Sequence, residues 1–142
     1  MSRITLAEAN RIIAGAFAKA DELSLKPLAV VVLDAGGHPI AYQRQDGAST
    51  GRFQLATGKA AGALFLGISS RKIGDMVADR PIFVASLGPI APGGVVPAAG
   101  GVIVVDGQGG TIGAVGISGD LSDKDELCTL AGIAAAGFSA QA

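Results

Sequence analysis

Two hairpin patterns, each preceded by helical segments, constrain the fold of this chain more than any other feature of its sequence. Residues 28–33 (LAVVVL) form an apolar run typical of a strand covered on both faces, and residues 34–39 have the composition of a turn. Residues 40–45 then alternate apolar and polar side chains. A second pair of strands, residues 102–105 and 112–118, flanks a turn at 106–110. Two hairpins separated by helices predict an α+β domain with an antiparallel sheet rather than a Rossmann fold.

Four helices are expected around these hairpins. Thr5 and Glu8 form a capping box that predicts a helix over residues 5–24. A second helix is expected over 52–68, with Gly58, Gly62 and Ala63 permitting close backbone packing. Its apolar positions are Phe53, Ala60, Ala61, Leu64, Phe65 and Ile68.

A shorter third helix is predicted to be capped by Ser69 or Ser70 and to end before Pro81. The fourth is predicted to begin near Ser122, whose side chain can cap it, and to bury a stripe of Leu127, Ala131, Ala134 and Phe138. Residues 86–101 contain three prolines and five glycines in sixteen positions, which predicts a long loop. Loops of this length in small domains are often functional.

Length and charge restrict the classes of protein. At 142 residues, the chain is expected to be a single domain, residues 1–142. A net charge of −1 argues against nucleic acid as a partner, and no apolar run is long enough for a membrane span. The first residues lack a signal peptide's apolar region, so a cytoplasmic protein is expected. Only 16% of the residues are charged and 49% are hydrophobic, which predicts a homo-oligomer.

Several motifs are insufficient for familiar sites. Residues 113–120 (GAVGISGD) lack the lysine and spacing of a phosphate-binding loop, although Gly119 and Asp120 precede a helix whose first amides could hold an anion. The acids at 120, 123, 125 and 126 do not match a calcium loop, and helix capping explains them better. One cysteine and one histidine cannot build a usual zinc site, so no metal centre is expected.

The two most reactive side chains each have two interpretations. His38 lies on the first hairpin turn, as a solvated residue or as one that ligates iron or moves a proton. Cys128 lies in the last helix, as a small buried apolar side chain or as a nucleophile activated by the helix N-terminus.

Four basic residues are conspicuous in a charge-poor chain: Arg44, Arg52, Lys59 and Arg71. Lys59 follows Arg52 by seven residues, so both project from one helical face. Two interpretations stay open. The cations bind carboxylates of a ligand, as arginine does with two parallel hydrogen bonds, or they form internal salt bridges, for example between Arg44 and Asp46.

The whole chain resembles the GlcG-like and HbpS-like family, which is related to the C-terminal domain of PduO-type proteins. The segments that carry the resemblance are residues 4–9, DAGGHP at 34–39, RQDGA at 44–48, GKAAGAL at 58–64, AAGGVIVVD at 98–106 and GAVGISGDLSDKDE at 113–126. The resemblance implies a profilin-like or PAS-like α+β fold with a five-stranded antiparallel sheet flanked by helices. It also implies assembly into dimers, tetramers or octamers, and haem binding or degradation in some relatives.

Two hypotheses follow from the residues and the resemblance. In the first, the chain binds haem or a small organic acid, with His38 as the single imidazole available to iron. The basic residues Arg44, Arg52, Lys59 and Arg71 would then hold carboxylates while the loop containing Gly100 and Gly101 closes over the ligand.

In the second hypothesis, the chain is a cofactor-free isomerase, tautomerase or lyase of small-acid catabolism. Lys59, Cys128, His38 or Asp120 would then transfer the proton, and an arginine would stabilise an enolate or carboxylate. Binding is preferred because the sequence contains no assembled catalytic constellation.

Overall fold

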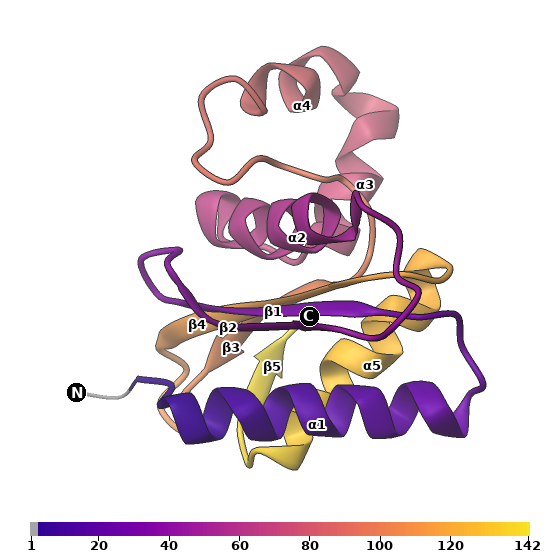
Figure 1. Ribbon diagram of the computed structural model, residues 1–142. Helices are drawn as coiled ribbons and strands as arrows, with labels where there is room; N and C mark the ends of the chain where they lie inside the picture. Colours follow the sequence, from indigo (N-terminus) through magenta and orange to yellow (C-terminus); the bar gives the residue numbers. More distant parts are fainter. Residues whose placement is uncertain (1–2) are drawn as a thin grey trace.

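The structure is a computed structural model that describes residues 3–142 as an α+β domain. A single sheet separates two layers of helices (Figure 1). In chain order, the elements are α1 (Leu6–Glu22), β1 (Ala29–Asp34), β2 (Pro39–Arg44), α2 (Arg52–Leu66), α3 (Ser70–Asp79), α4 (Pro81–Leu87), β3 (Gly101–Val105), β4 (Thr111–Ser118), α5 (Ser122–Ala135) and β5 (Ser139–Gln141).

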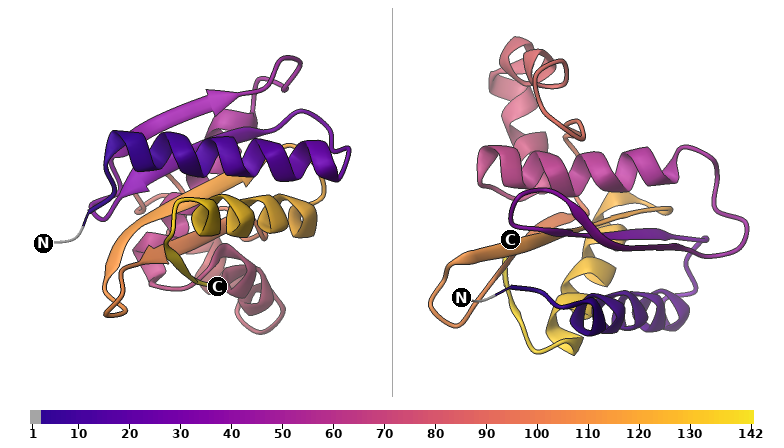
Figure 2. Two further views of the ribbon diagram at one scale, coloured as in Figure 1. Left: turned by 90° about the horizontal axis from the view of Figure 1, so that it is seen from below. Right: turned by 60° about the vertical axis from the view of Figure 1, so that its left-hand side comes forward.

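The sheet has the strand order β2-β1-β4-β3-β5, and every neighbouring pair is antiparallel. Both predicted hairpins are present, as β1–β2 and β3–β4, and five strands are present as the family resemblance implied. Helices α1 and α5 pack side by side on one face of the sheet, whereas α2 covers the other face and α3 and α4 lie beyond it (Figures 1 and 2).

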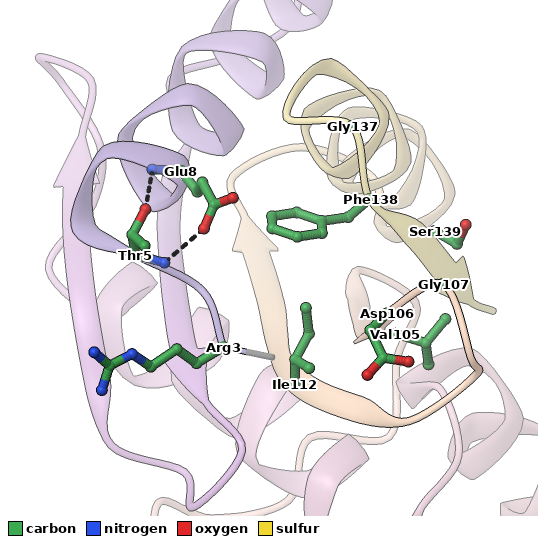
Figure 3. A pocket seen from close by; sticks show the side chains of 10 residues that line it. All are labelled: Arg3, Thr5, Glu8, Val105, Asp106, Gly107, Ile112, Gly137, Phe138 and Ser139. Carbon is green, nitrogen blue, oxygen red and sulfur yellow. Dashed lines mark hydrogen bonds between the residues drawn. The ribbon is translucent and has the colours of Figure 1, made fainter. Parts of the chain in front are cut away.

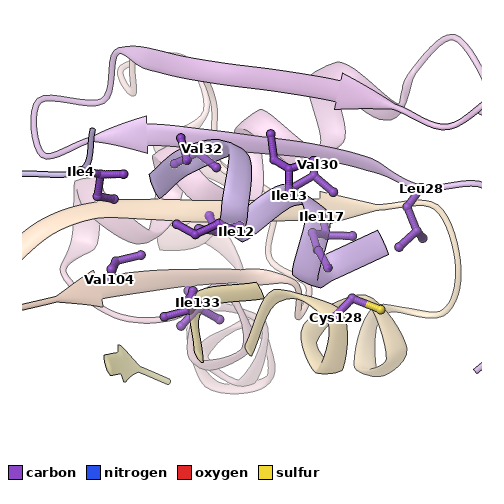
Figure 4. Close-up of a cluster of buried hydrophobic side chains, with 14 of the residues drawn as sticks. Ile4, Ile12, Ile13, Leu28, Val30, Val32, Val104, Ile117, Cys128 and Ile133 are labelled. Atoms are coloured by element: carbon purple, nitrogen blue, oxygen red, sulfur yellow. The ribbon is translucent and has the colours of Figure 1, made fainter. Parts of the chain in front are cut away.

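The larger part of the core lies between the sheet and the α1–α5 layer. Val30 and Val32 of β1 and Ile117 of β4 face Ile12 and Ile13 of α1 (Figure 4). The β1 strand is fully buried from Ala29 to Val32 because helices cover both faces, which explains its unbroken apolar run. The capping box at the start of α1 is confirmed, with Thr5 Oγ1 accepting from the Glu8 N–H and Glu8 Oε1 accepting from the Thr5 N–H.

The α2 face of the sheet is packed backbone to backbone. A Cβ atom at Gly116 of β4 would collide with the carbonyl oxygen of Ala56, and one at Gly62 would lie 3.1 Å from the Cα of Val95. Small residues therefore permit the close approach of α2 to the sheet and to the loop after α4, as the sequence predicted for Gly58 and Gly62.

The sequence pattern did not predict two elements, α4 and β5. Helix α4 begins at Pro81 and extends to Leu87, so residues 86 and 87 of the predicted loop are helical. A proline ends a preceding helix but is also favoured in the first turn of a new one. Pro81 has both roles, and the sequence analysis used only the first. Strand β5 has three residues, all exposed, and carries no alternating pattern that would identify it.

The predicted apolar stripes on two helices are wrong in part. Phe53 and Phe65 of α2 are each 42% exposed, and the buried residues of this helix are alanines, glycines and Lys59. In α5, Leu127 is 46% exposed and the buried residues are Asp125, Glu126, Cys128, Thr129, Gly132 and Ile133. Ser122 is the first helical residue rather than the cap, which is Leu121.

No helix among residues 3–142 has both the length and the apolarity needed to cross a membrane.

Candidate functional site

His38 lies exposed at the end of the β1–β2 turn, where its backbone is fixed but its ring is not. Its N–H donates to Asp34 Oδ1 at 3.0 Å and its carbonyl oxygen accepts from the Asp34 N–H at 2.8 Å. The imidazole itself makes no hydrogen bond or ion pair with any residue in 3–142. Both ring nitrogens are therefore available, and the turn holds the residue in place.

The His38 turn forms one wall of an open cavity of about 280 Å³, which we call the His38 groove. The C-terminal half of α2 and the loop after α4 form its other walls, and the lining residues are Ala35, Gly36, Gly37, His38, Ala61, Leu64, Phe65, Pro92 and Gly93. His38 is the only ionisable side chain in this lining. The groove therefore combines an apolar wall with a single imidazole, and an imidazole is one of the side chains that ligate haem iron in proteins.

An orphaned hydroxyl lies beside the groove. Thr57 Oγ1 is the one buried side-chain polar atom in residues 3–142 that lacks a hydrogen-bond partner. Thr57 is on α2, four residues before the lining residue Ala61, and its methyl group would be 3.7 Å from a Cβ at Gly93, another lining residue. A buried hydroxyl without a partner is costly, and a polar atom of a bound molecule or of water could satisfy it.

Lys59 and Asp125 form a buried ion pair that is not part of the His38 groove. Lys59 Nζ lies 3.1 Å from Asp125 Oδ2 and donates to the Ile117 carbonyl oxygen at 3.0 Å. Asp125 Oδ1 accepts from the Asp120 N–H at 3.0 Å. Burial lowers the pKa of Lys59 and raises that of Asp125, while their mutual attraction opposes both shifts. The pair connects α2, the end of β4 and the start of α5.

Gly100 and Gly101 pack against Lys59. The structure therefore brings together three of the residues predicted to bind the ligand. A Cβ at Gly100 would lie 3.0 Å from Lys59 Nζ, and one at Gly101 would collide with the Lys59 backbone carbonyl. The carbonyl oxygen of Gly100 accepts from Thr129 Oγ1 at 2.7 Å. These glycines therefore close the space around the lysine, and all three residues are buried.

Arg71 and Arg44 lie outside this cluster. Arg71 of α3 forms a salt bridge of 3.0 Å with Glu126 of α5, in which Nε and Nη2 both contact the carboxylate. Arg44 is exposed at the end of β2, and no ion pair with Asp46 is found among the described residues. Lys59 and Arg71 thus form internal salt bridges with carboxylates of α5, whereas the alternative of an Arg44–Asp46 pair is not found among the described residues.

Arg52 is half-buried, and no carboxylate among residues 3–142 forms an ion pair with it. Its Nη1 donates to Ser118 Oγ and its Nε to Ser49 Oγ, both at 3.0 Å. Neither hydroxyl carries charge, and Arg52 has no ion-pair partner within residues 3–142. It lines a small cavity of about 160 Å³ together with Lys26, Pro27, Gly47, Ala48, Ser49 and Gly119.

His38 and two of the cations, Arg44 and Arg52, lie at opposite ends of the sheet. Along β2, His38 and Arg44 are six residues apart, which is about 20 Å at about 3.4 Å per residue. Along α2, Arg52 is thirteen residues from Phe65 of the His38 groove, again about 20 Å. The structure therefore does not assemble the predicted residues into one pocket.

The remaining candidates for proton transfer are not poised for it. Cys128 is fully buried, and burial raises the pKa of its thiol to about 11, which supports its interpretation as a core residue. The carboxylate of Asp120 accepts from the backbone N–H groups of Lys26 and Leu121, which lower its pKa. No cluster of three or more potential metal ligands is found in residues 3–142.

A larger open cavity, of about 590 Å³, lies at the start of α1 and contains none of the predicted site residues. Its apolar floor includes Ile112 and Phe138, and the carboxyl group of Glu8 stands beside the Phe138 ring (Figure 3). It offers no imidazole or thiol. Glu8 belongs to the capping box, and Asp106 holds the β3–β4 turn by accepting from the N–H groups of Gln108 and Gly110.

Sequence reasoning missed the polar partners on α5, at the start of α3 and at the end of β4: Asp125, Glu126, Thr129, Ser70 and Ser118. Asp125 and Thr129 are four residues apart, and both are buried on the face of α5 that meets α2 and β3. This spacing is the one signal that could have identified them, because two polar residues one turn apart in a charge-poor chain indicate a polar buried stripe.

The chain is a small α+β domain with one antiparallel sheet between two helical layers, and its candidate site is an apolar groove lined by one imidazole, that of His38. A family model described as haem-degrading protein HbpS-like matches residues 4–134, so the chain belongs to this family.

Solved structures agree with this assignment. The PduOC–heme complex shares 25% sequence identity, with a TM-score of 0.85 over 97% of this chain and 98% of that one. HbpS shares 27% identity, with a TM-score of 0.80 over 94% and 90%. The ORFY protein of Klebsiella pneumoniae shares 27% identity, with a TM-score of 0.84 over 96% and 93%. No curated protein matches the chain.

Proposed function

We propose that this protein binds haem in the His38 groove, where the His38 imidazole would hold the iron. The observation that carries the proposal is the unbonded imidazole at the edge of an apolar groove, in a chain of the HbpS-like family. A structural relative has been solved as a heme complex, which supports the same cofactor here.

The chemistry of the groove fits the group. Apolar walls from α2 and the loop after α4 accept a flat hydrocarbon ring, and the turn hydrogen bonds with Asp34 hold His38 in position. When bound, the haem would supply an iron centre with its own ligand and redox chemistry. The protein residues would bind and orient it: His38 would hold the iron, and Leu64 and Phe65 would exclude water from one side.

The groove is small for the whole macrocycle. Its volume of about 280 Å³ lies below the about 300–1,000 Å³ typical of enclosed ligand sites. We therefore place part of the haem outside the single chain, where a second copy in a homo-oligomer would cover it. No arginine or lysine lines the groove, so the propionates would point to solvent or to that second copy. The cytoplasm is the proposed location of this assembly.

The geometry supports binding over cofactor-free catalysis. An isomerase, tautomerase or lyase needs a base and a charge-stabilising group within reach of one substrate. Lys59 is buried and paired, Cys128 is buried with a raised pKa, and His38 lies about 20 Å from Arg44 along β2.

Titration of the apoprotein with haemin tests the proposal. We expect a saturable Soret band at one haem per chain, at least tenfold weaker binding by His38→Ala, and unchanged binding by Gln108→Ala. Gln108 is a matched control because it is an exposed turn residue on the other hairpin. A wild-type Soret band retained at full affinity in His38→Ala would refute the ligand assignment, and the absence of saturable haemin binding would refute the function.

A further inference from the structure

The cavity at Arg52 is a second polar site, separate from the His38 groove. Three segments meet there: the loop before β1, the connection between β2 and α2, and the end of β4. The lining residues are Lys26, Pro27, Gly47, Ala48, Ser49, Arg52 and Gly119. Two of these seven are cationic and none is acidic, so the lining itself carries a net positive charge.

The guanidinium of Arg52 is oriented but not neutralised. The hydroxyls of Ser49 and Ser118 fix Nε and Nη1 from two different elements, at 3.0 Å each. A guanidinium has five N–H donors, so these two bonds leave donors free for a ligand. Two other cations of α2 and α3, Lys59 and Arg71, each have a carboxylate of α5 as a partner, whereas Arg52 has none within residues 3–142.

Two acidic groups near the cavity, Asp120 and Asp125, already accept hydrogen bonds, and a third, Asp46 next to Gly47, is exposed and forms no ion pair among the described residues. Asp120 follows the lining residue Gly119, and its two oxygens accept from the N–H groups of Lys26 and Leu121. Asp125 is bonded to Lys59 and to the Asp120 N–H. Neither carboxylate is directed to Arg52, so the guanidinium can accept an anion from solution.

The start of α2 adds to the positive potential. Its first turn contains no acidic residue and its cap, Gly51, provides no side-chain hydrogen bond. The positive end of the helix dipole is therefore uncompensated beside Arg52. Burial is the main cause that lowers the pKa of nearby Lys59, and the charge of Arg52 lowers it slightly further.

We propose that the Arg52 cavity binds a small oxyanion, a carboxylate or a phosphate, through the free donors of the Arg52 guanidinium, with Lys26 at its rim. At about 160 Å³ and about 30 Å³ for each water-sized group, the cavity accommodates an anion of about five non-hydrogen atoms. Acetate and inorganic phosphate both meet this limit. The site is independent of haem, because it lies at the opposite end of α2 from the His38 groove.

Equilibrium dialysis of the haem-free protein with radiolabelled acetate, and separately with radiolabelled phosphate, tests the proposal at constant ionic strength set by sodium chloride. We expect saturable binding of at least one of them at one anion per chain. Arg52→Gln should weaken it at least tenfold, and Arg52→Lys less, because lysine keeps the charge but loses the planar fork. Arg11→Gln, an exposed α1 residue, is the matched control and should bind as wild type.

A second variant keeps the test decisive if Arg52→Gln does not fold. Ala48→Asp places a carboxylate in the lining and should abolish binding while leaving the circular dichroism spectrum unchanged. Acetate binding alone identifies a carboxylate site, phosphate binding alone a phosphate site, and mutual competition a general oxyanion site. Saturable binding of neither anion, or binding at full strength in a folded Ala48→Asp or Arg52→Gln variant, would overturn the proposal whatever the outcome of the haemin titration.

Discussion

At the scale of single residues, Lys59 and Asp125 are the most demanding pair in the molecule. Both side chains are almost completely buried, and their charges have left water for a contact of 3.1 Å. Attraction within such a pair roughly offsets the loss of hydration, so the pair contributes little net stability, but either charge left alone is costly.

We expect Lys59→Met to lower the free energy of unfolding by about 3–5 kcal/mol, because it leaves the Asp125 carboxylate buried without its partner. The double variant Lys59→Met/Asp125→Asn should recover part of this loss, since an amide is neutral and its oxygen can still accept from the Asp120 N–H. Urea unfolding of both variants and of Asp125→Asn alone measures the coupling. Additive losses from the two single substitutions would contradict this account.

At the scale of elements, the contact of α2 with the sheet depends on missing side chains. Gly116 of β4 lies against the Ala56 carbonyl oxygen and the Ala60 methyl group, so a methyl at position 116 has no space. We expect Gly116→Ala to destabilise the protein by about 1–3 kcal/mol, as overpacking does in well-packed cores. Gly107→Ala is the control, because a Cβ at this turn position meets no atom within 4 Å. Thermal unfolding compares the two, and equal midpoints would show that α2 can move away at no cost.

Elements with a local signal could be predicted from the sequence, and those defined by their neighbours could not. The α1 capping box, the hairpin turn at 34–39 and the Ser69 cap of α3 act within a few residues, and all three are confirmed. Helix α4 and strand β5 have seven and three residues, too short for a periodic pattern. The buried face of α5 was wrong because it is polar, and apolar periodicity cannot identify a face that contains Asp125 and Thr129.

The same limit applies to the candidate site. Sequence reasoning selected Arg44, Arg52, Lys59 and Arg71 as a group, and the structure places the last three around α5 and the end of β4 but leaves Arg44 exposed at the end of β2. It could not show which cation has a carboxylate partner, because those partners are 55 to 66 residues away in the chain. It also did not show that His38 lies far from Arg44 and Arg52, because this depends on which end of the sheet carries the β1–β2 turn relative to the start of α2.

At the scale of the whole molecule, several large hydrophobic side chains are exposed in a chain of which only 16% of the residues are charged. The largest exposures are on α4 and the loop after it, where Ile82 is 85% and Ile90 is 66% exposed. An apolar cavity of about 240 Å³ between α3 and α4 lies on the same part of the molecule. The homo-oligomer expected from composition therefore has a candidate interface, which we call the α4 face.

We expect sedimentation velocity to show an oligomer of the wild-type chain, and Ile82→Glu and Ile90→Glu to shift it toward the monomer, because a charge buried between copies without a partner is costly. Leu6→Glu is the matched control: Leu6 is 60% exposed but lies on α1, on the other side of the sheet. Dissociation by Leu6→Glu alone would move the interface to the α1 layer, and a monomeric wild-type chain would contradict the inference from composition. In that last case the exposed part of the haem in the His38 groove would have no second copy to cover it, and haemin should bind weakly and with fast exchange.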